Sequence, residues 1–223
     1  MKCWLKDNSC RKNPCIGEDD CLILYKMNYL FDQAKIPVNQ RRKRDLVIDE
    51  DGTDRDQFIK LSNIANNILE FVENGDNLYL YSKQAGNGKT SWSLRLAQCY
   101  IKKIWLKTDL RCRVLFINVP TFLIAMKANI SEPNEYYQHI KNNVLDADLV
   151  IWDDIANKVG TEYEISNLLS MIDARLTNGK SNIYSSNISP SELGNLLDIR
   201  LASRIGSAST CIEFKGGDKR HLS

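Results

Sequence analysis

The stretch that decides the fold is Ser82-Lys83-Gln84-Ala85-Gly86-Asn87-Gly88-Lys89-Thr90. It follows a short β-rich run, 78–81, and precedes a segment that we expect to be helical from residue 89 to about residue 107. A loop with glycines ahead of a Lys-Thr pair, between a strand and a helix, is typical of a phosphate-binding loop. Glycine lets backbone N–H groups turn inward around phosphate oxygens without a Cβ in the way. The sequence therefore predicts that this turn binds a nucleotide.

The residues of this loop have separate predicted roles. We expect the Lys89 ammonium on the β- and γ-phosphate oxygens and the Thr90 hydroxyl on Mg²⁺. The helix that begins there adds the positive end of its dipole. Lys83 stands where the motif usually has its first glycine. Because that position shapes the entry turn more than the cradle, we expect impaired affinity rather than lost function. The predicted nucleotide-binding residues are Ala85, Gly86, Asn87, Gly88, Lys89, Thr90 and Ser91.

Around the loop, apolar runs alternate with helical patterns. The run 149–152 is continuously apolar, as expected for a strand buried on both faces of a sheet. Between 162 and 176, apolar residues recur at helical spacing. This alternation predicts an α/β fold, with a parallel sheet flanked by helices on both faces. The expected strands are 78–81, 113–119, 149–152, 183–184 with their neighbours, and 211–214; the expected helices are 58–72, 89–107, 121–145 with a break at Pro133, 162–176 and a short one near 191–197.

The composition is that of a globular protein. The chain has 223 residues, of which 43% are hydrophobic and 26% charged, so wholesale disorder is excluded. No run approaches the roughly 18 apolar residues of a membrane span. The N-terminus lacks the unbroken apolar stretch of a signal peptide. We therefore expect a soluble, cytoplasmic protein with no membrane partner.

The net charge of +2 hides an uneven distribution. Residues 1–44 carry ten Lys or Arg against five Asp or Glu, whereas residues 45–60 carry two against six. The change of sign follows Arg41-Arg42-Lys43-Arg44 and is our predicted boundary between an N-terminal module, 1–44, and the main domain, 45–223. The four cations have two interpretations, a contact with nucleic acid phosphates or a solvated linker.

The seven cysteines fall into two groups. One group crowds into a core-poor segment at the N-terminus, where cytosolic conditions disfavour disulfides. Its thiolates are candidates to hold a tetrahedral zinc or an iron–sulfur cluster, with four unrelated free thiols as the alternative. The N-terminal group is Cys3, Cys10, Cys15 and Cys21, and the group expected in the core is Cys99, Cys112 and Cys211.

Polar residues follow two of the predicted strands. Asp153 and Asp154 come directly after the apolar run 149–152, which places their carboxylates at the same sheet edge as the phosphate-binding loop. We expect Asp153 to hold the Mg²⁺ shell and Asp154 to orient or deprotonate the attacking water. Asn187 follows the next strand and is a candidate to hydrogen-bond the γ-phosphate or that water. Arg204 is either a cation offered to a neighbouring subunit's nucleotide or a solvated surface charge.

Together these elements resemble the AAA+ helicase loaders of bacterial replication, of the DnaC/DnaI type, from about residue 46 onward. The resemblance implies an ATPase without the C-terminal helical lid, because only 19 residues follow Arg204. It assigns the Walker A motif to Lys89 and Thr90, the Walker B pair to Asp153 and Asp154, the sensor to Asn187 and the trans-acting arginine to Arg204. It also makes Arg175 a weaker candidate for an intersubunit contact and Arg220 a candidate second sensor.

The same resemblance implies partners. Several copies would associate so that each ATP lies between one loop and the next subunit's Arg204. The module 1–44 would bind the replicative DNA helicase, and the segment 121–145 would track single-stranded DNA. Hydrolysis is expected to be slow, because Asp154 is one methylene shorter than the usual glutamate. Candidate DNA contacts are Lys127, Asn129 and Lys141 for phosphates and Tyr136, Tyr137 and His139 for bases, with packing against the sheet as the alternative for the aromatic side chains.

Three other functions remain open on the sequence alone. A transposase-assisting ATPase of the IstB type shares this core but serves another partner. A small-molecule P-loop kinase would need a lid of clustered arginines, and none occurs between the strands. A nucleotide-gated adaptor would bind the helicase without hydrolysing ATP.

Overall fold

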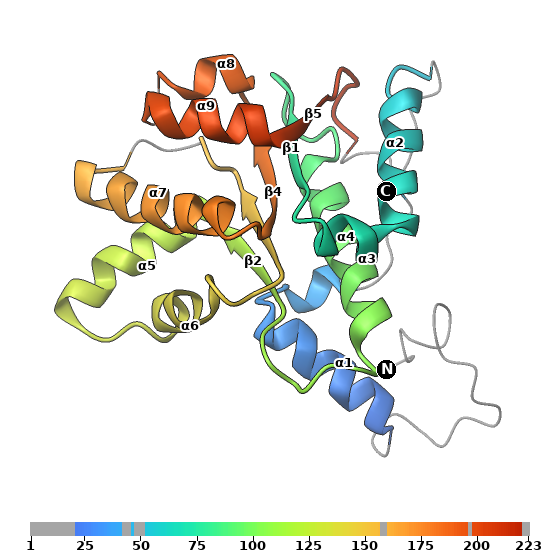
Figure 1. The fold of residues 1–223 in the computed structure, drawn as a ribbon, viewed down its shortest axis with the longest axis vertical. Coiled ribbons are helices and arrows are strands. Elements are labelled where there is room, and N and C mark those ends of the chain that lie inside the picture. Colours follow the sequence, from blue (N-terminus) through green and yellow to red (C-terminus); the bar gives the residue numbers. More distant parts are fainter. Residues whose placement is uncertain (1–20, 42–45, 47–51, 157–159, 196–197, 220–223) are drawn as a thin grey trace.

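The fold is built around a sheet of five parallel strands, seen in Figure 1 in a computed structural model. The structure describes residues 21–41, 46, 52–156, 160–195 and 198–219. The sheet order is β2-β3-β4-β1-β5, and every neighbouring pair is parallel. The predicted α/β class with a parallel sheet is thereby confirmed. The strands are β1 (Asn77–Tyr81), β2 (Val114–Asn118), β3 (Leu149–Asp153), β4 (Ser181–Ser186) and β5 (Ser209–Glu213).

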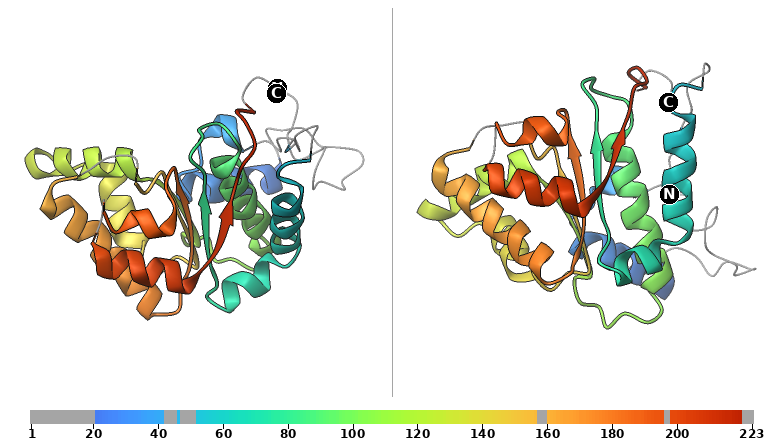
Figure 2. Two further views of the ribbon diagram at one scale, coloured as in Figure 1. Left: turned by 90° about the horizontal axis from the view of Figure 1, so that it is seen from above. Right: turned by 45° about the horizontal axis from the view of Figure 1, so that its top comes forward.

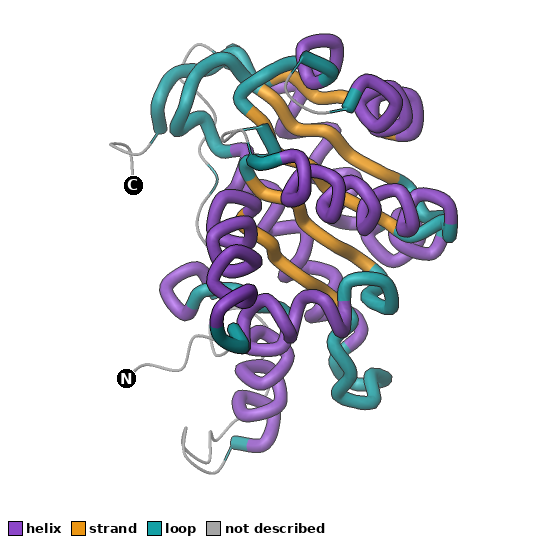
Figure 3. The backbone as a smooth tube through the Cα atoms, turned by 90° about the vertical axis from the view of Figure 1, so that its left-hand side faces the viewer, coloured by secondary structure: helices purple, strands orange, loops and turns teal. Residues whose placement is uncertain are grey.

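Helices cover both faces of this sheet (Figures 2 and 3). Successive strand side chains point to opposite faces, so Leu78 and Leu80 join one apolar cluster and Tyr79 joins the other. On the first face lie α1 (Leu22–Gln33), α2 (Arg55–Asn66), α3 (Ile68–Glu73) and α4 (Lys89–Ile104), with the short 3-10 helix η1 (Val38–Gln40) after α1. On the second face lie α5 (Val119–Ser131), α6 (Glu135–Asn143), α7 (Glu162–Thr177), α8 (Pro190–Leu193) and α9 (Ile199–Ala208).

Two predicted helices are interrupted, each for a local reason. The segment 121–145 divides into α5 and α6 around Pro133, as expected, and the Asn134 side chain caps α6 by accepting a hydrogen bond from the Tyr137 N–H. The segment 58–72 is not one helix. It breaks at Asn67, whose backbone (φ −105°, ψ 27°) lies outside the helical region.

Helix α1, which the sequence did not predict, belongs to the core of the main domain. Met27 and Phe31 are buried in the same apolar cluster as residues of α4 and β2. The Phe116 N–H of β2 donates a hydrogen bond to the Ala34 carbonyl (2.8 Å). The apolar face of α1 is therefore covered by the sheet domain, and the boundary after residue 44 stays a prediction. Residues 1–20 and 42–44 of the predicted module lie outside the described residues.

The cysteine predictions have mixed outcomes. Cys112 is buried as predicted, and this burial raises the pKa of its thiol to about 12. Cys211 was expected in the core but is exposed, because β5 is an edge strand. Cys21 is buried at the start of α1. The other three members of the N-terminal group, Cys3, Cys10 and Cys15, lie outside the described residues, so their zinc or iron–sulfur role stays a prediction.

Within the described part of the chain, no three or more His, Cys, Asp or Glu side chains are grouped so as to hold a metal ion. In the same part, no helix combines the length and the apolar character needed to cross a membrane.

The place of α1 in the core makes a stability prediction. Phe31 has no exposed surface, so Phe31→Ala should lower the free energy of unfolding by about 3–5 kcal/mol in urea denaturation. Tyr25 lies on the same helix but is 73% exposed, and Tyr25→Ala should change stability by no more than about 0.5 kcal/mol. An unchanged main unfolding transition in Phe31→Ala would mean that α1 folds separately from the main domain.

Candidate functional site

The predicted phosphate-binding loop connects β1 to α4 at the carboxyl edge of the sheet. Gly86 and Gly88 have φ values of +78° and +104°, which other residues adopt only with strain. A Cβ on Gly86 would lie 2.0 Å from the Asp218 Oδ1 atom. The glycines at these two positions are therefore required by the backbone of the loop.

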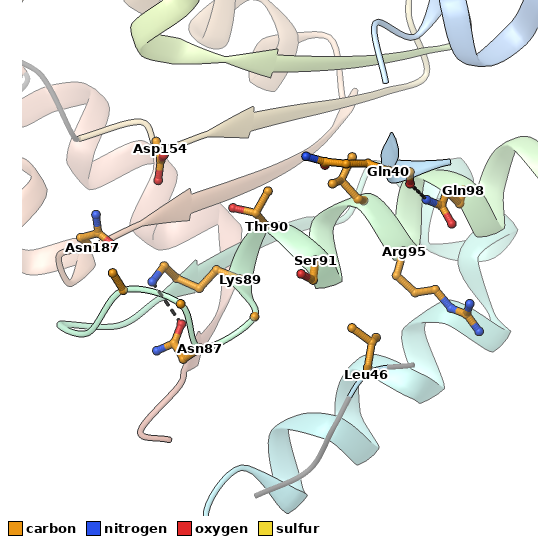
Figure 4. Close-up of a pocket in the computed structure, with 14 residues that line it drawn as sticks. Gln40, Leu46, Asn87, Lys89, Thr90, Ser91, Arg95, Gln98, Asp154 and Asn187 are labelled. Carbon is orange, nitrogen blue, oxygen red and sulfur yellow. Dashed lines mark hydrogen bonds between the residues drawn. The ribbon is translucent and has the colours of Figure 1, made fainter. Parts of the chain in front are cut away.

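A cavity of about 370 Å³ opens beside this loop (Figure 4). Its volume lies in the range of small-molecule sites. All seven predicted nucleotide-binding residues line it, together with Asp154 and Asn187. Gln40, Leu46, Leu94, Arg95 and Gln98 also line it and were not predicted. A pocket lined by the loop, by Asp154 and Asn187, and by apolar side chains is suited to a nucleotide.

Lys89 is buried beside the loop and is already directed at it. Its Nζ atom donates hydrogen bonds to the Gln84 carbonyl (3.0 Å) and to Asn87 Oδ1 (3.2 Å). Asn87 in turn donates a short hydrogen bond to the Ser82 hydroxyl. These bonds keep the ammonium next to the backbone that would surround a phosphate.

Asp153 lies where a magnesium ion would be held. Its side chain is buried, and Oδ1 accepts hydrogen bonds from Thr90 Oγ1 (2.8 Å) and from Ser185 Oγ (2.6 Å). A carboxylate and a hydroxyl in contact provide the hard oxygen donors that Mg²⁺ takes. The residues present therefore fit the predicted metal.

Asp154 follows Asp153 in an unusual backbone conformation, with φ +57°. Its side chain lines the cavity on the same side as Asn187 and Lys89 (Figure 4). Burial raises the pKa of this carboxyl, the negative charge of Asp153 raises it further, and the positive charge of Lys89 lowers it. The raised pKa gives the carboxyl more affinity for a proton than an ordinary aspartate has, which suits a group that deprotonates water.

The two predicted arginines lie apart from the cavity. Arg204 is on the exposed side of α9, where it forms an ion pair with Asp173 and a hydrogen bond to Thr177 Oγ1 (3.2 Å). It does not line the cavity of its own chain. Arg220 lies outside the described residues.

The prediction that Arg175 makes an intersubunit contact is wrong. Its side chain has no exposed surface. The guanidinium donates to the carbonyls of Val144 (2.6 Å), Ala147 (2.7 Å) and Ser181 (2.6 Å) and to Asn182 Oδ1 (2.7 Å). Arg175 therefore joins β4 to the segment before β3 inside the domain.

Some of the residues predicted to contact DNA make contacts inside the domain instead. Tyr137 is buried and stacked on Phe122, with ring centroids 5.6 Å apart, so it is not available to a base. His139 Nε2 is hydrogen-bonded to the Gln33 carbonyl (2.8 Å), and burial lowers its pKa. Asn129 Oδ1 accepts from the Asn134 N–H (3.0 Å).

Other residues of this set remain accessible. Lys127 and Lys141 are exposed on α5 and α6, and Lys127 lies 3.8 Å from Glu164. Tyr136 is partly buried; burial raises its pKa to about 12, and its hydroxyl is hydrogen-bonded to the Asn118 backbone. The basic part of the predicted DNA surface is therefore present, whereas its aromatic part is mostly internal.

The structure adds a contact that no local pattern indicated. After β5 the chain returns to the loop, and the Lys219 N–H donates to the Gly86 carbonyl (2.9 Å). The buried Asp54 carboxylate holds the same segment by accepting from the N–H groups of Lys215 (2.9 Å) and Gly216 (3.1 Å). These bonds join residues more than 130 positions apart, so only tertiary structure reveals them.

The raised pKa of Asp154 makes a prediction about stability and pH. The pKa of this carboxyl is higher in the folded chain than in the unfolded chain. The folded state therefore loses stability as the pH rises from the lower pKa to the higher one. Asp154→Asn should therefore be more stable than the parent at neutral pH in urea denaturation. The difference should shrink toward about pH 4, where an ordinary aspartate takes up its proton.

The exposed Asp146 provides the control, since Asp146→Asn should shift stability by no more than about 0.5 kcal/mol at either pH. An Asp154→Asn protein that is less stable at neutral pH, or whose advantage persists in acid, would contradict this assignment.

Comparisons with known proteins place this site in a family. The profile of the bacterial DnaA ATPase domain matches residues 58–211. Among solved structures, the chain is similar to the DnaC helicase loader, with 20% identity, a TM-score of 0.57 and coverage of 73% of this chain and 90% of that one. It is similar to DnaI, with 18% identity, a TM-score of 0.60 and coverage of 83% and 94%.

A third similar structure is the replication initiator DnaA bound to AMPPCP and single-stranded DNA, with 19% identity and a TM-score of 0.59. The match covers 77% of this chain and 48% of that one, so the chain corresponds to about half of the initiator. No curated protein matches the chain by sequence. The solved structures show that the chain shares their fold. The profile match over more than half of the sequence shows that the chain belongs to the family of the bacterial DnaA ATPase domain.

Proposed function

We propose that this protein is an ATP-dependent loader that delivers the replicative DNA helicase to single-stranded DNA. The observation that carries the proposal is the convergence on one cavity of the glycine loop with Lys89 and Thr90, Asp154 and Asn187. Asp153 lies directly behind this lining, hydrogen-bonded to Thr90. The fold shared with the DnaC helicase loader and with DnaI supports the choice of partner.

ATP would occupy the cavity with its phosphates at the loop. The N–H groups of the loop and the ammonium of Lys89 would bind the β- and γ-phosphates, and Leu46 with Leu94 would supply apolar contacts. Thr90 and Asp153 would hold Mg²⁺. When bound, the ion neutralises negative charge on the phosphate oxygens.

Asp154 and Asn187 would act on the attacking water. Both line the cavity on the side of the Lys89 ammonium (Figure 4). The carboxylate of Asp154 accepts the proton of the water, and the amide of Asn187 hydrogen-bonds the water or the γ-phosphate. Asp154 reaches less far than a glutamate would, so turnover is slow.

The proposed DNA surface is the exposed face of α5 and α6. Lys127 and Lys141 present ammonium groups there, and Ile124 (58% exposed) and Ile130 (73% exposed) present apolar surface next to them. A cation beside apolar surface suits a strand whose phosphates and bases are both accessible. The initiator DnaA structure, which has a similar fold, contains single-stranded DNA.

The proposed assembly is a homo-oligomer in which Arg204 acts on the neighbouring subunit's ATP. Arg204 is exposed on α9, and its partners among the described residues are the half-exposed Asp173 and Thr177 at the surface, so leaving them costs little. A guanidinium offered from a neighbour stabilises the charge that develops on the transferred phosphate.

One prediction of the proposed function concerns helicase loading. With ATP, the full chain should capture a replicative helicase and transfer it to circular single-stranded DNA. Lys89→Ala should still capture the helicase, because the N-terminal part binds it, but transfer should fall at least about tenfold for want of the phosphate contact. Co-sedimentation of helicase with the DNA circle measures the transfer.

Lys60→Ala, which changes an exposed lysine on α2, is the matched control and should transfer normally. A wild-type chain that binds ATP but captures no helicase would refute the loader. Transfer that is unchanged in Lys89→Ala would favour an adaptor that works without hydrolysis.

Another prediction of the proposed function concerns Arg204. Lys89→Ala and Arg204→Ala should each hydrolyse ATP at least about tenfold more slowly than the parent. Mixing the two should restore part of the activity, because some interfaces then combine an intact loop with an intact arginine. A phosphate-release assay measures both.

Arg200→Ala, on an exposed position of the same helix, should match the parent in this assay. A mixture with only the summed activities of its components would refute action between subunits.

A further inference from the structure

Ser185 forms hydrogen bonds with three successive residues, the acidic pair and Ile155. Its hydroxyl donates to Asp153 Oδ1 (2.6 Å) and accepts from the Asp154 N–H (3.0 Å). Its carbonyl accepts from the Ile155 N–H (3.0 Å). Ser185 belongs to β4 and has no exposed surface. One serine thus attaches the end of β3 and the turn after it to the neighbouring strand.

A hydroxyl is suited to this position because it donates and accepts at the same time. Its single proton goes to the carboxylate, and a lone pair receives the Asp154 N–H. An alanine would supply neither, and a buried N–H without a partner is costly. The Asp154 backbone at φ +57° is strained and persists only where surrounding contacts hold it.

The same hydroxyl determines how the Asp153 carboxylate is presented. Thr90 and Ser185 both donate to Oδ1, one from α4 and one from β4. Among the described residues, no hydrogen bond reaches Oδ2. Two donors on one oxygen fix the plane of the carboxylate and leave the other oxygen for a ligand.

We propose that Ser185 is a positioning residue of the magnesium site. It orients Asp153 toward the ion, and it holds the turn that presents Asp154 to the cavity. This inference rests on the proposed nucleotide-binding function and adds to it a residue that acts through the acidic pair without touching the nucleotide.

A second serine on the same strand separates this role from general stability. Ser181 stands at the other end of β4, is equally buried, and donates its hydroxyl proton to the Asp76 carbonyl (2.7 Å). It has no contact with the acidic pair. Ser181→Ala therefore removes a comparable buried hydrogen bond from β4 while leaving the metal site intact.

The test compares nucleotide binding with and without the metal. Calorimetry on the full chain gives the Kd of a non-hydrolysable ATP analogue in Mg²⁺ and in EDTA, and the ratio of the two is the metal-dependent gain in affinity. Ser185→Ala should lower this gain at least about tenfold while leaving the Kd in EDTA unchanged. Ser181→Ala should lower the Tm and keep the parent's gain.

Two conservative variants extend the test. Ser185→Thr retains the hydroxyl and should retain the gain. If Ser185→Ala does not fold, Ser185→Cys replaces it, since a thiol has similar shape but is a weak donor, and the gain should again fall.

Three outcomes would overturn the inference. Ser185→Ala, or Ser185→Cys in its place, could show the parent's gain, or Ser181→Ala could lower the gain equally. Either result leaves the proposed function standing if the parent binds the analogue with Mg²⁺. A parent chain that does not bind the analogue at all would overturn both the inference and the proposed function.

Discussion

The parallel direction of the five strands is the constraint on which the site depends. Because β1, β3 and β4 end at one edge, residues that follow them meet in space although up to about a hundred positions separate them along the chain. The hydrogen bond between Thr90 and Asp153 is the point where that convergence becomes chemical contact. An antiparallel partner in the middle of the sheet would have sent one of these groups to the opposite edge.

The buried polar groups of this domain are costly unless each finds partners. The ammonium of Lys89 donates hydrogen bonds to the loop, and the guanidinium of Arg175 donates to backbone carbonyls. Burial lowers the pKa of Arg175 to about 10. Asp154 is half-buried, and both its left-handed backbone and its partial desolvation are unfavourable. Unfavourable terms of this kind concentrate at functional sites, where geometry matters more than stability.

The sequence predicted the local features well. All five strands and the loop were expected because hydrophobic runs and glycine spacing are short-range signals. Helix α1 was missed because only contacts with distant segments reveal where its apolar side packs. Arg175 was misassigned for the same reason: its partners come from parts of the chain that lie together only after folding. The exposure of Cys211 followed from sheet order, which no local pattern encodes.

The bond between Lys219 and Gly86 has a consequence for ligand binding. Asp54 fixes the segment after β5, and through Lys219 this segment holds the glycine loop in place without a ligand. Because the loop already has few accessible conformations, it loses little conformational entropy when an anion binds. The segment 215–219 thus preorganises a glycine-rich turn that would otherwise sample many conformations.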